Sequence, residues 1–358
     1  MRSAPYLLLV AAFLIMKTEL YAQELIDVKV EPQSVEFNLY AAQQSIKNIK
    51  TLVFINKLDQ YKGSRVDTSR LEFYDKAGNK TKSYSFSAGR RTGELNFQTL
   101  YNNKVWQWQS TSFNDKNRVS VSQSIRDAKG KDLMYHNRDI MNGDTMSFGD
   151  AIFTYNASGQ LIKRDDFRNG KLVLRKTFEY KGTDMVLAQV RSNFDPQDFH
   201  QEYRYTYNSD HLPVEKSYSL IRYGKPDPAQ VTYFTYKGKN LVNERYPDYS
   251  VAGKYIAVDY TYDAQNRLSE AMAKQDTLYR HITYQYEGNK LVKINAETNY
   301  WLKFTKELNI PDANSRTPLP MKFERAYTYD SHGHIATITE KLNGELKTER
   351  YYSIAYYE

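Results

Sequence analysis

Aromatic and polar positions alternate in short runs along the C-terminal two thirds of the chain. In VDYTYDAQNRLSEA (258–271), Tyr260 and Tyr262 flank a threonine, a polar segment follows, and Leu268 begins a second alternating run. Successive side chains of a β-strand point to opposite faces, so residues two apart lie on the same face. The pattern therefore predicts a strand, a tight turn and a second strand, with the aromatic rings on one face.

The same phrase recurs with variations. Neighbouring copies are 24 to 29 residues apart, except for a last interval of 43 residues, which contains the segment 300–320. Pro311, Pro318 and Pro320 predict that this segment is an irregular insertion. The repetition predicts β-hairpins stacked on their neighbours as one antiparallel sheet. The residues on which the copies align are Tyr155, Tyr180, Tyr207, Tyr236, Tyr262, Tyr286 and Tyr329.

The polar segments predict two classes of turn. The next apolar residue follows the aligned tyrosine after six residues at 155–161, 262–268 and 329–335, and after five at 207–212, 236–241 and 286–291. Aspartates that follow an aromatic residue, namely Asp75, Asp263 and Asp330, are expected to cap the turn by bonding its backbone. The sequences NGK (169–171) and NGE (343–345) predict further reversals on the opposite side of the sheet.

The predicted fold class is all-β, with stacked antiparallel β-hairpin repeats in an extended sheet that is able to curl. Residues 151–358 carry the clear repeats, and residues 23–150 form an N-terminal β region with degenerate copies such as LEFYDKAGNKTKSYSF (71–86). No linker separates the two regions, which favours one elongated repeat domain. The alternative is a separate N-terminal β-domain that ends near residue 100.

The first 22 residues have the features of a secretory signal peptide. Arg2 precedes an apolar run of eleven residues (6–16), and Ala22 provides a small residue at the expected cleavage site. Because eleven residues fall short of the roughly 20 that span a bilayer, an uncleaved anchor is the weaker alternative. We therefore expect export to the periplasm or the medium, with no membrane span after cleavage.

The repeat resembles a known sequence family. YTYDSHGHI (327–335) and YTYDAQNRL (260–268) resemble the YD repeat of the Rhs and teneurin families, and the resemblance covers 70–86 and 153–357. It implies stacked β-hairpins in a curled sheet, which in larger relatives coils into a shell around a toxic C-terminal domain. No toxin domain or self-cleavage motif is visible here, and we expect the chain to be too short for a closed shell. The open ends of the sheet would then be covered by residues 23–60 and 349–358, or by another protein.

Composition narrows the functional classes. The chain has no cysteine, which excludes disulfides and a lipidated N-terminal cysteine. Its formal net charge of +8 comes from interspersed charges and not from a basic stripe, so nucleic acid is not an expected partner. Tyrosine is twice as frequent as phenylalanine, 32 residues against 16, which suits half-buried sheet positions whose hydroxyl groups reach polar partners.

No catalytic motif, cofactor motif or metal-ligand spacing stands out. His332 and His334 form an i, i+2 pair that could ligate a metal, but they occupy variable turn positions and are more simply explained as solvated turn residues. We therefore expect no enzyme, no cofactor and no metal. A hydrolase with two converging carboxylates is the less favoured alternative.

Aromatic residues give the candidate binding site. Trp106 and Trp108 lie two apart in VWQWQS (105–110), and Tyr300 and Trp301 begin the insertion. Exposed rings of this kind stack on sugars, so the expected function is binding of envelope or extracellular polysaccharide. The alternative is a structural scaffold or a scaffold for an envelope protein. In that case the tryptophans would be core residues, and a sheet edge or the 300–320 insertion would contact the partner.

Overall fold

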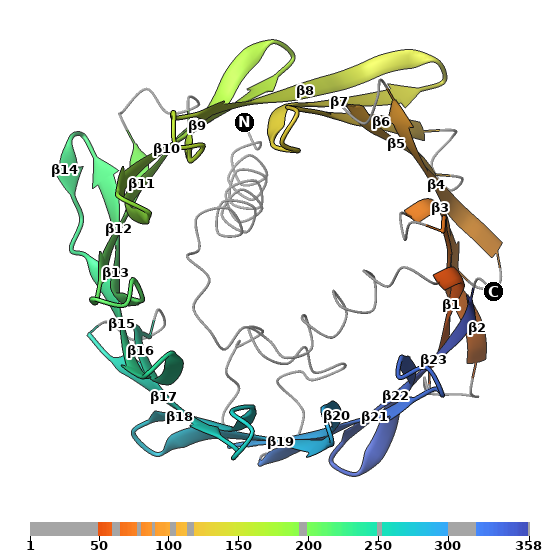
Figure 1. Ribbon diagram of the computed structural model, residues 1–358, viewed down its shortest axis with the longest axis vertical. Helices are drawn as coiled ribbons and strands as arrows, with labels where there is room; N and C mark the ends of the chain where they lie inside the picture. Colours follow the sequence, from red (N-terminus) through yellow and green to blue (C-terminus); the bar gives the residue numbers. More distant parts are fainter. Residues whose placement is uncertain are drawn as a thin grey trace, which may run out of the picture.

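The computed structural model describes residues 49–58, 65–76, 80–87, 90–100, 105–112, 118–192, 199–248, 253–299 and 320–356 of the chain. These residues form twenty-three β-strands in one sheet and contain no helix (Figure 1), which confirms the all-β prediction. The described residues accordingly include no helical segment that could span a bilayer. The predicted signal peptide and most of the 300–320 insertion lie outside the described residues.

The strands of the first half are β1 (Ile49–Leu58), β2 (Arg65–Tyr74), β3 (Lys80–Ser87), β4 (Arg90–Leu100), β5 (Val105–Ser112), β6 (Arg118–Arg126), β7 (Asp132–Met141), β8 (Asp144–Tyr155), β9 (Leu161–Arg168), β10 (Lys171–Lys181) and β11 (Asp184–Ser192). The others are β12 (His200–Tyr207), β13 (Pro213–Arg222), β14 (Lys225–Pro226), β15 (Gln230–Lys237), β16 (Asn240–Pro247), β17 (Tyr255–Tyr262), β18 (Leu268–Gln275), β19 (Leu278–Glu287), β20 (Lys290–Thr298), β21 (Met321–Tyr329), β22 (Ile335–Leu342) and β23 (Glu345–Tyr356). Pairing continues without a break across residues 100 and 150.

The sheet closes on itself. Each strand pairs antiparallel with its neighbour in sequence, with one exception: the two-residue β14 pairs with β13 but not with β15, and β13 itself pairs with β15. β1 pairs with both β2 and β23; Val53, for example, lies opposite Leu71 and Ser353. The expectation of open sheet ends in a chain too short to close is therefore wrong. At about 4.8 Å per strand, the sheet has a perimeter of roughly 110 Å, enough for the ring in Figure 1.

Side-chain capping forms the longer turns of the repeat. In each of them the side-chain Oδ1 of the first turn residue accepts a hydrogen bond of 2.9–3.0 Å from the backbone N–H four residues later. This confirms the capping role predicted for Asp263 and Asp330, whereas part of the turn after Asp75 lies outside the described residues. The capping residues are Asp127, Asn156, Asn208, Asp263 and Asp330.

One turn was assigned to the wrong class. Tyr207 pairs with Pro213, six residues away, and not with Leu212 as its apolar spacing predicted. Asn208 caps this turn by accepting a bond from the Leu212 N–H, and His211 adopts a positive φ of 59°. His211 thus occupies the left-handed position that Gly159 and Gly333 hold in the turns after Asn156 and Asp330. Leu212 is therefore a turn residue, and the second strand begins at Pro213.

The shorter turns and the opposite rim use glycine. Gly182, Gly238 and Gly288 are each the first residue of a two-residue loop and have positive φ values of 54–62°, a pattern typical of type II′ hairpins. On the opposite rim, the pairs Asn169-Gly170 and Asn343-Gly344 have positive φ at both residues, as type I′ hairpins require. The predicted Asn-Gly reversals are therefore confirmed.

The aligned tyrosines join neighbouring repeats. In six of them the hydroxyl group donates to a backbone carbonyl near the start of a strand in the preceding unit, over 2.6–3.0 Å. Tyr262, for example, donates to Leu241, and Tyr286 donates to Leu268. Burial raises the pKa of Tyr207 and Tyr329 to about 12, so their hydroxyl groups remain donors even in moderately alkaline solution. We call this set the clamp tyrosines: Tyr155, Tyr180, Tyr207, Tyr262, Tyr286 and Tyr329.

Asparagines make a similar connection on the opposite rim. The Asn169 side chain accepts a bond of 3.1 Å from the Phe148 N–H, and the Asn169 N–H donates to the Phe148 carbonyl over 2.9 Å. Asn299 joins Tyr279, and Asn343 joins Lys322, through the same two bonds. At both rims, side chains therefore form hydrogen bonds with the backbone of the preceding repeat.

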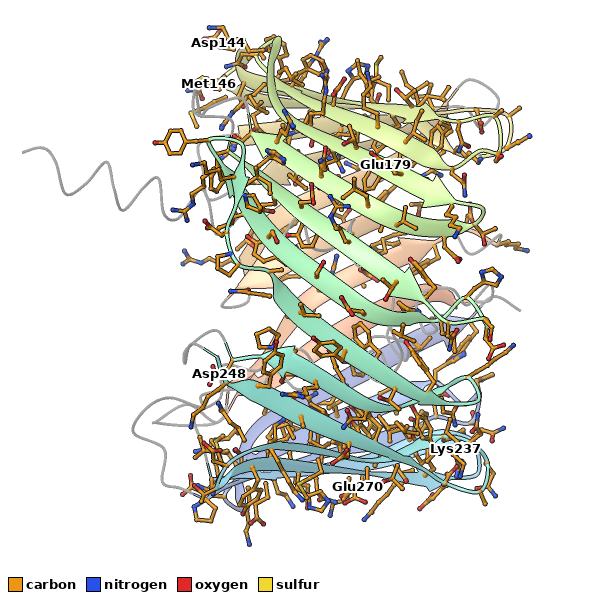
Figure 2. The ribbon with its side chains drawn as sticks, turned by 90° about the vertical axis from the view of Figure 1, so that its left-hand side faces the viewer. Asp144, Met146, Glu179, Lys237, Asp248 and Glu270 are labelled. Atoms are coloured by element: carbon orange, nitrogen blue, oxygen red, sulfur yellow. The ribbon has the colours of Figure 1, made fainter. Side chains whose placement is uncertain are left out.

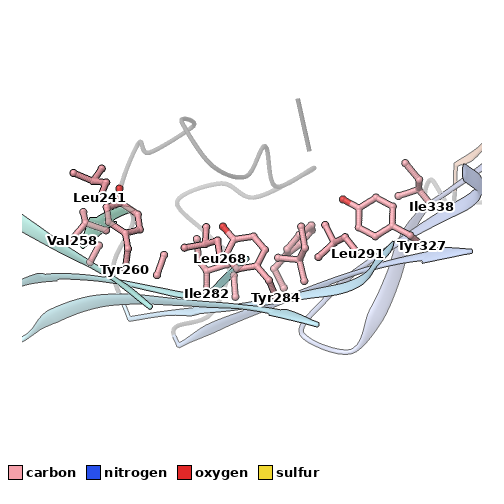
Figure 3. Close-up of a cluster of buried hydrophobic side chains, with 14 of the residues drawn as sticks. Leu241, Val258, Tyr260, Leu268, Ile282, Tyr284, Leu291, Tyr327 and Ile338 are labelled. Atoms are coloured by element: carbon pink, nitrogen blue, oxygen red, sulfur yellow. The ribbon is translucent and has the colours of Figure 1, made fainter. Parts of the chain in front are cut away.

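The two faces of the sheet differ in polarity over its second half. Along β17 the buried Val258 and Tyr260 alternate with the exposed Asp259 and Thr261. The buried side chains form a continuous cluster from Phe234 to Tyr352 on the concave side of the sheet (Figure 3), which we call the inner face. Polar side chains such as Glu270 occupy the outer face (Figure 2).

A charged cluster is buried among the strands next to the closure. Glu340 on β22 is completely buried, and its carboxylate forms ion pairs with Arg325 on β21 at 2.5 Å and with Arg350 on β23 at 3.1 Å. Arg350 donates a hydrogen bond, whereas the contact with Arg325 is an ion pair without a directed hydrogen bond at the Glu340 Oε1 atom. The side chain of Arg325 is itself only 6% exposed.

Candidate binding surface on the outer face of β6–β8

The predicted aromatic site is only partly within the described residues. Trp106 and Trp108 belong to β5, where the backbone register places them opposite Thr99 and Phe97 of β4. Their side chains, and the residues Tyr300 and Trp301, lie outside the described part of the structure. The stacking role of these four residues therefore stays a prediction.

The histidine pair lies in the turn between β21 and β22. His332 is exposed, but the ring of His334 is half-buried, and its Nδ1 contacts the hydroxyl group of Tyr356. That hydroxyl donates to Asp330 Oδ2 over 2.6 Å, which fastens the end of β23 to the turn. In the described ranges no three His, Asp or Glu side chains converge in a way that could hold a metal ion.

The outer face of β6, β7 and β8 departs from the polar pattern seen elsewhere. The register sets Phe148 opposite Arg138 and Arg138 opposite Val121, so these three side chains share one face. Ile152, Met134 and Ile125 form a parallel row on that face. Phe148 is 40% exposed and Ile152 is 36% exposed, and Met146 near the β7–β8 turn reaches 62% (Figure 2).

The cross-strand register identifies this surface as the outer face. Ala151, Tyr135 and Ser124 pair in a row on the opposite face, and both Ala151 and Ser124 are buried. Ala151 lies four residues before the clamp tyrosine Tyr155 on the same strand, so it shares the inner face. In this part of the ring, buried serine and alanine side chains lie on the inside, and Val121, Phe148 and Ile152 face outward.

A row of polar side chains crosses the apolar surface. Gln123 Nε2 donates to Gln107 Oε1 over 2.8 Å, and His136 lies opposite Gln123 on β7. His136 Nδ1 is 2.6 Å from Asp150 Oδ1 on β8; since a carboxylate only accepts, this nitrogen is the donor. The Asp150 bond therefore fixes the ring and directs Nε2 away from it.

Arg138 is the basic group of this surface that faces outward without a carboxylate opposite it. Its side chain is exposed and has no hydrogen-bond or ion-pair partner among the described residues. Together with Val121, Gln123 and His136 it lines a shallow pocket on the outer face. This surface combines an aromatic ring, aliphatic side chains, a guanidinium without a partner among the described residues, an amide and a bonded imidazole–carboxylate pair. We call it the β6–β8 surface, and it consists of Val121, Gln123, Ile125, Met134, His136, Arg138, Phe148, Asp150 and Ile152.

The sequence contains a signal for this surface that the search for aromatic pairs missed. RVSVSQSIR (118–126) alternates valine with serine, a pattern in which the apolar residues usually face the core. Here the serines are the buried residues, because Ser122 and Ser124 hydrogen-bond to Asn137 and Asp132 on β7. Alternation reveals that two faces differ, but it does not say which of them points outward.

Comparison with known proteins gives little further information. No protein-family model matches the sequence, and no curated protein matches it. Among solved structures, a porin-like protein from Bacteroides uniformis ATCC 8492 is similar over 86% of this chain and 98% of that chain. The sequence identity is 11% and the TM-score is 0.29, a level of similarity that carries no argument about function.

Proposed function

We propose that this chain is an exported, non-enzymatic, YD-like repeat protein whose closed sheet is a scaffold for binding envelope or extracellular polysaccharide. The observation that carries the proposal is the β6–β8 surface, where Phe148 and Ile152 are exposed beside polar side chains. Exposed apolar surface of this kind commonly marks an interaction site. Export rests on the signal-peptide features of residues 1–22.

The chemistry of the surface favours a saccharide. The C–H face of a sugar ring packs against an aromatic or aliphatic side chain, while its hydroxyl groups need donors and acceptors around the edge. Phe148 and Val121 supply the apolar contacts, and Gln123 and His136 supply polar atoms in the neighbouring row. The β-sheet holds these side chains at fixed spacing, so little ordering is needed on binding.

A protein-binding scaffold is the second candidate. The closure of the sheet limits how a partner could bind to it. Since β1 pairs with β23, the described strands leave no lateral edge to which a partner could add a strand. A protein partner would therefore have to contact a face or a rim of the ring. Tyr223 and Met146, both near turns, are the most exposed large apolar residues of the described part and could serve such a contact.

The test is affinity electrophoresis of the full chain through native gels that contain a panel of neutral and acidic polysaccharides. We expect at least one polysaccharide to retard the protein, and we expect Phe148→Ala to reduce the retardation severalfold, because the ring supplies the stacking surface. Folding should be unaffected, since Phe148 is 40% exposed and the Asn169 bonds involve only its backbone.

Tyr223→Ala is the matched control, because Tyr223 is an exposed aromatic residue on a different strand connection. Retardation by a polysaccharide that Phe148→Ala weakens and Tyr223→Ala preserves would support the proposal. A chain that no polysaccharide retards would contradict it and leave the protein-binding scaffold as the better account.

A further inference from the structure

We infer that the pocket between β6 and β7 binds the carboxylate of an acidic saccharide, such as a uronate polymer, with Arg138 as the ion-pair partner. The inference rests on the proposed function, because it names the class of polysaccharide that the β6–β8 surface would take. It differs from the aromatic-pair prediction in its residues, since it involves none of the predicted tryptophans.

Arg138 differs from the two arginines of the neighbouring strand β6. Arg126 pairs with Asp132 at 2.7 Å, and Arg118 pairs with Asp139 at 3.1 Å. The guanidinium of Arg138 has no such carboxylate among the described residues, although its fork of donors fits a carboxylate in two parallel bonds. An anionic ligand would complete the pairing that the protein supplies for its neighbours.

The nearest carboxylate on this face is already occupied. Asp150 lies opposite His136, not opposite Arg138, and its Oδ1 bonds the imidazole at 2.6 Å. Directly opposite Arg138 are Val121 on one side and Phe148 on the other, neither of which can satisfy a guanidinium. The sheet therefore presents an isolated positive charge between two apolar side chains.

Polar atoms next to Arg138 suit the hydroxyl groups of a sugar that bears the carboxylate. His136 Nε2 has no protein partner within the described residues, and Asp150 holds the ring in place through Nδ1. Gln123 uses its Nε2 for Gln107, which leaves its Oε1 as an acceptor. All three polar side chains line the same pocket, together with Val121.

The shape of the site fits a polymer better than an enclosed small molecule. The pocket is shallow and lies on the wall of a continuous sheet, so a chain can pass across it without ending there. Phe148 and Ile152 extend the apolar surface along β8 on one side of the pocket. Each unit of a uronate polymer carries a carboxylate and a sugar ring. The carboxylate would pair with Arg138, and the ring would pack against the apolar side chains of β8.

The experiment measures binding of the full chain, at one fixed salt concentration near 0.15 M, to polygalacturonate, to dextran and to poly-glutamate. We expect polygalacturonate to bind most tightly, because dextran lacks the carboxylate and poly-glutamate lacks the sugar rings. Arg138→Gln should weaken the polygalacturonate affinity about tenfold or more, as loss of a charged hydrogen-bonding partner does. Arg138→Lys keeps the positive charge but loses the paired N–H donors of the guanidinium. The affinity of this variant should therefore lie between those of the wild type and Arg138→Gln.

Lys237→Gln is the matched control, because it removes the same charge from an exposed position at the end of β15 (Figure 2). An Arg138→Gln variant that binds as tightly as the wild type, or a Lys237→Gln variant that loses as much affinity, would overturn the inference. Equal binding of poly-glutamate and polygalacturonate would also overturn it, since the site would then be selecting charge alone.

The outcomes separate the inference from the proposed function. If the wild-type chain binds dextran and not polygalacturonate, the acidic-saccharide site is wrong while polysaccharide binding stands. If it binds none of the three polymers and no other polysaccharide of the panel, the proposed function itself fails.

Discussion

Replacing Glu340 with alanine is expected to lower the free energy of unfolding by about 3–5 kcal/mol. The substitution removes the carboxylate that pairs with Arg325 at 2.5 Å and with Arg350 at 3.1 Å. Arg325, with a side chain only 6% exposed, would keep its charge without this partner in a site that water barely reaches. The cost therefore arises mainly from removing the carboxylate that neutralises this buried charge. Urea denaturation of the two proteins measures the difference.

Glu345→Ala is the control for this prediction. Glu345 is in the neighbouring strand β23 and pairs with Lys347 at 2.7 Å, but its side chain is 77% exposed. Solvent screens such a pair, so we expect the variant to unfold at nearly the same urea concentration as the wild type. Equal losses in the two variants would contradict the account of Glu340 as the centre of a buried ion cluster.

Removing a single clamp hydroxyl should also destabilise the fold measurably. Tyr286→Phe keeps the ring but deletes the donor to the Leu268 carbonyl, a bond of 2.9 Å between neighbouring repeats. Leu268 is buried, so its carbonyl would lose this bond with little access to water. We expect a loss of about 1–3 kcal/mol in the free energy of unfolding, the range for an unsatisfied buried polar group.

Tyr233→Phe provides the comparison, because Tyr233 is 41% exposed and its hydroxyl has no hydrogen-bond partner among the described residues. The same urea experiment should detect no loss in this variant. If Tyr286→Phe were equally neutral, the tyrosines would be acting only through their rings. The connection between repeats would then have to come from the strand ladders alone.

The repeating part of the fold follows closely from the sequence, because its causes are local. Tyr262 and Leu268 are paired across a capped turn, as their spacing predicted, and Asp263 bonds the turn backbone. The Asn-Gly pairs also form the predicted reversals. The Tyr207 turn was misassigned because the apolar residue nearest in sequence, Leu212, belongs to the turn 208–212, which Asn208 stabilises.

Closure of the ring could not be predicted, because it depends on two segments almost 300 residues apart. Pairing of β1 with β23 requires the curvature of every intervening strand to sum to a full turn, and no short motif encodes that sum. The outward position of the apolar residues in the β6–β8 surface was not predicted for a different reason. Serine hydrogen bonds on the inner face made Val121 and Ile125 the outward residues, which reverses the usual meaning of the alternation.

The central claim is that the repeats form a closed ring, and a pair of engineered cysteines tests it most directly. The chain contains no cysteine of its own, so a disulfide can form only between the two that are introduced. Val53 and Ser353 lie directly opposite each other across the β1–β23 ladder. Such residues have Cα atoms about 4.5–5.5 Å apart, within the range that a disulfide spans.

The measurement is the extent of intramolecular disulfide formation in the Val53→Cys/Ser353→Cys double variant under mild oxidation, by non-reducing electrophoresis. The control is Val53→Cys/Thr348→Cys, because Thr348 pairs with Leu58, five residues further along β1 and roughly 17 Å away. A closed ring predicts nearly complete cross-linking of the first pair and little of the second. Failure of the first pair to cross-link, or equal cross-linking of both, would contradict the closure.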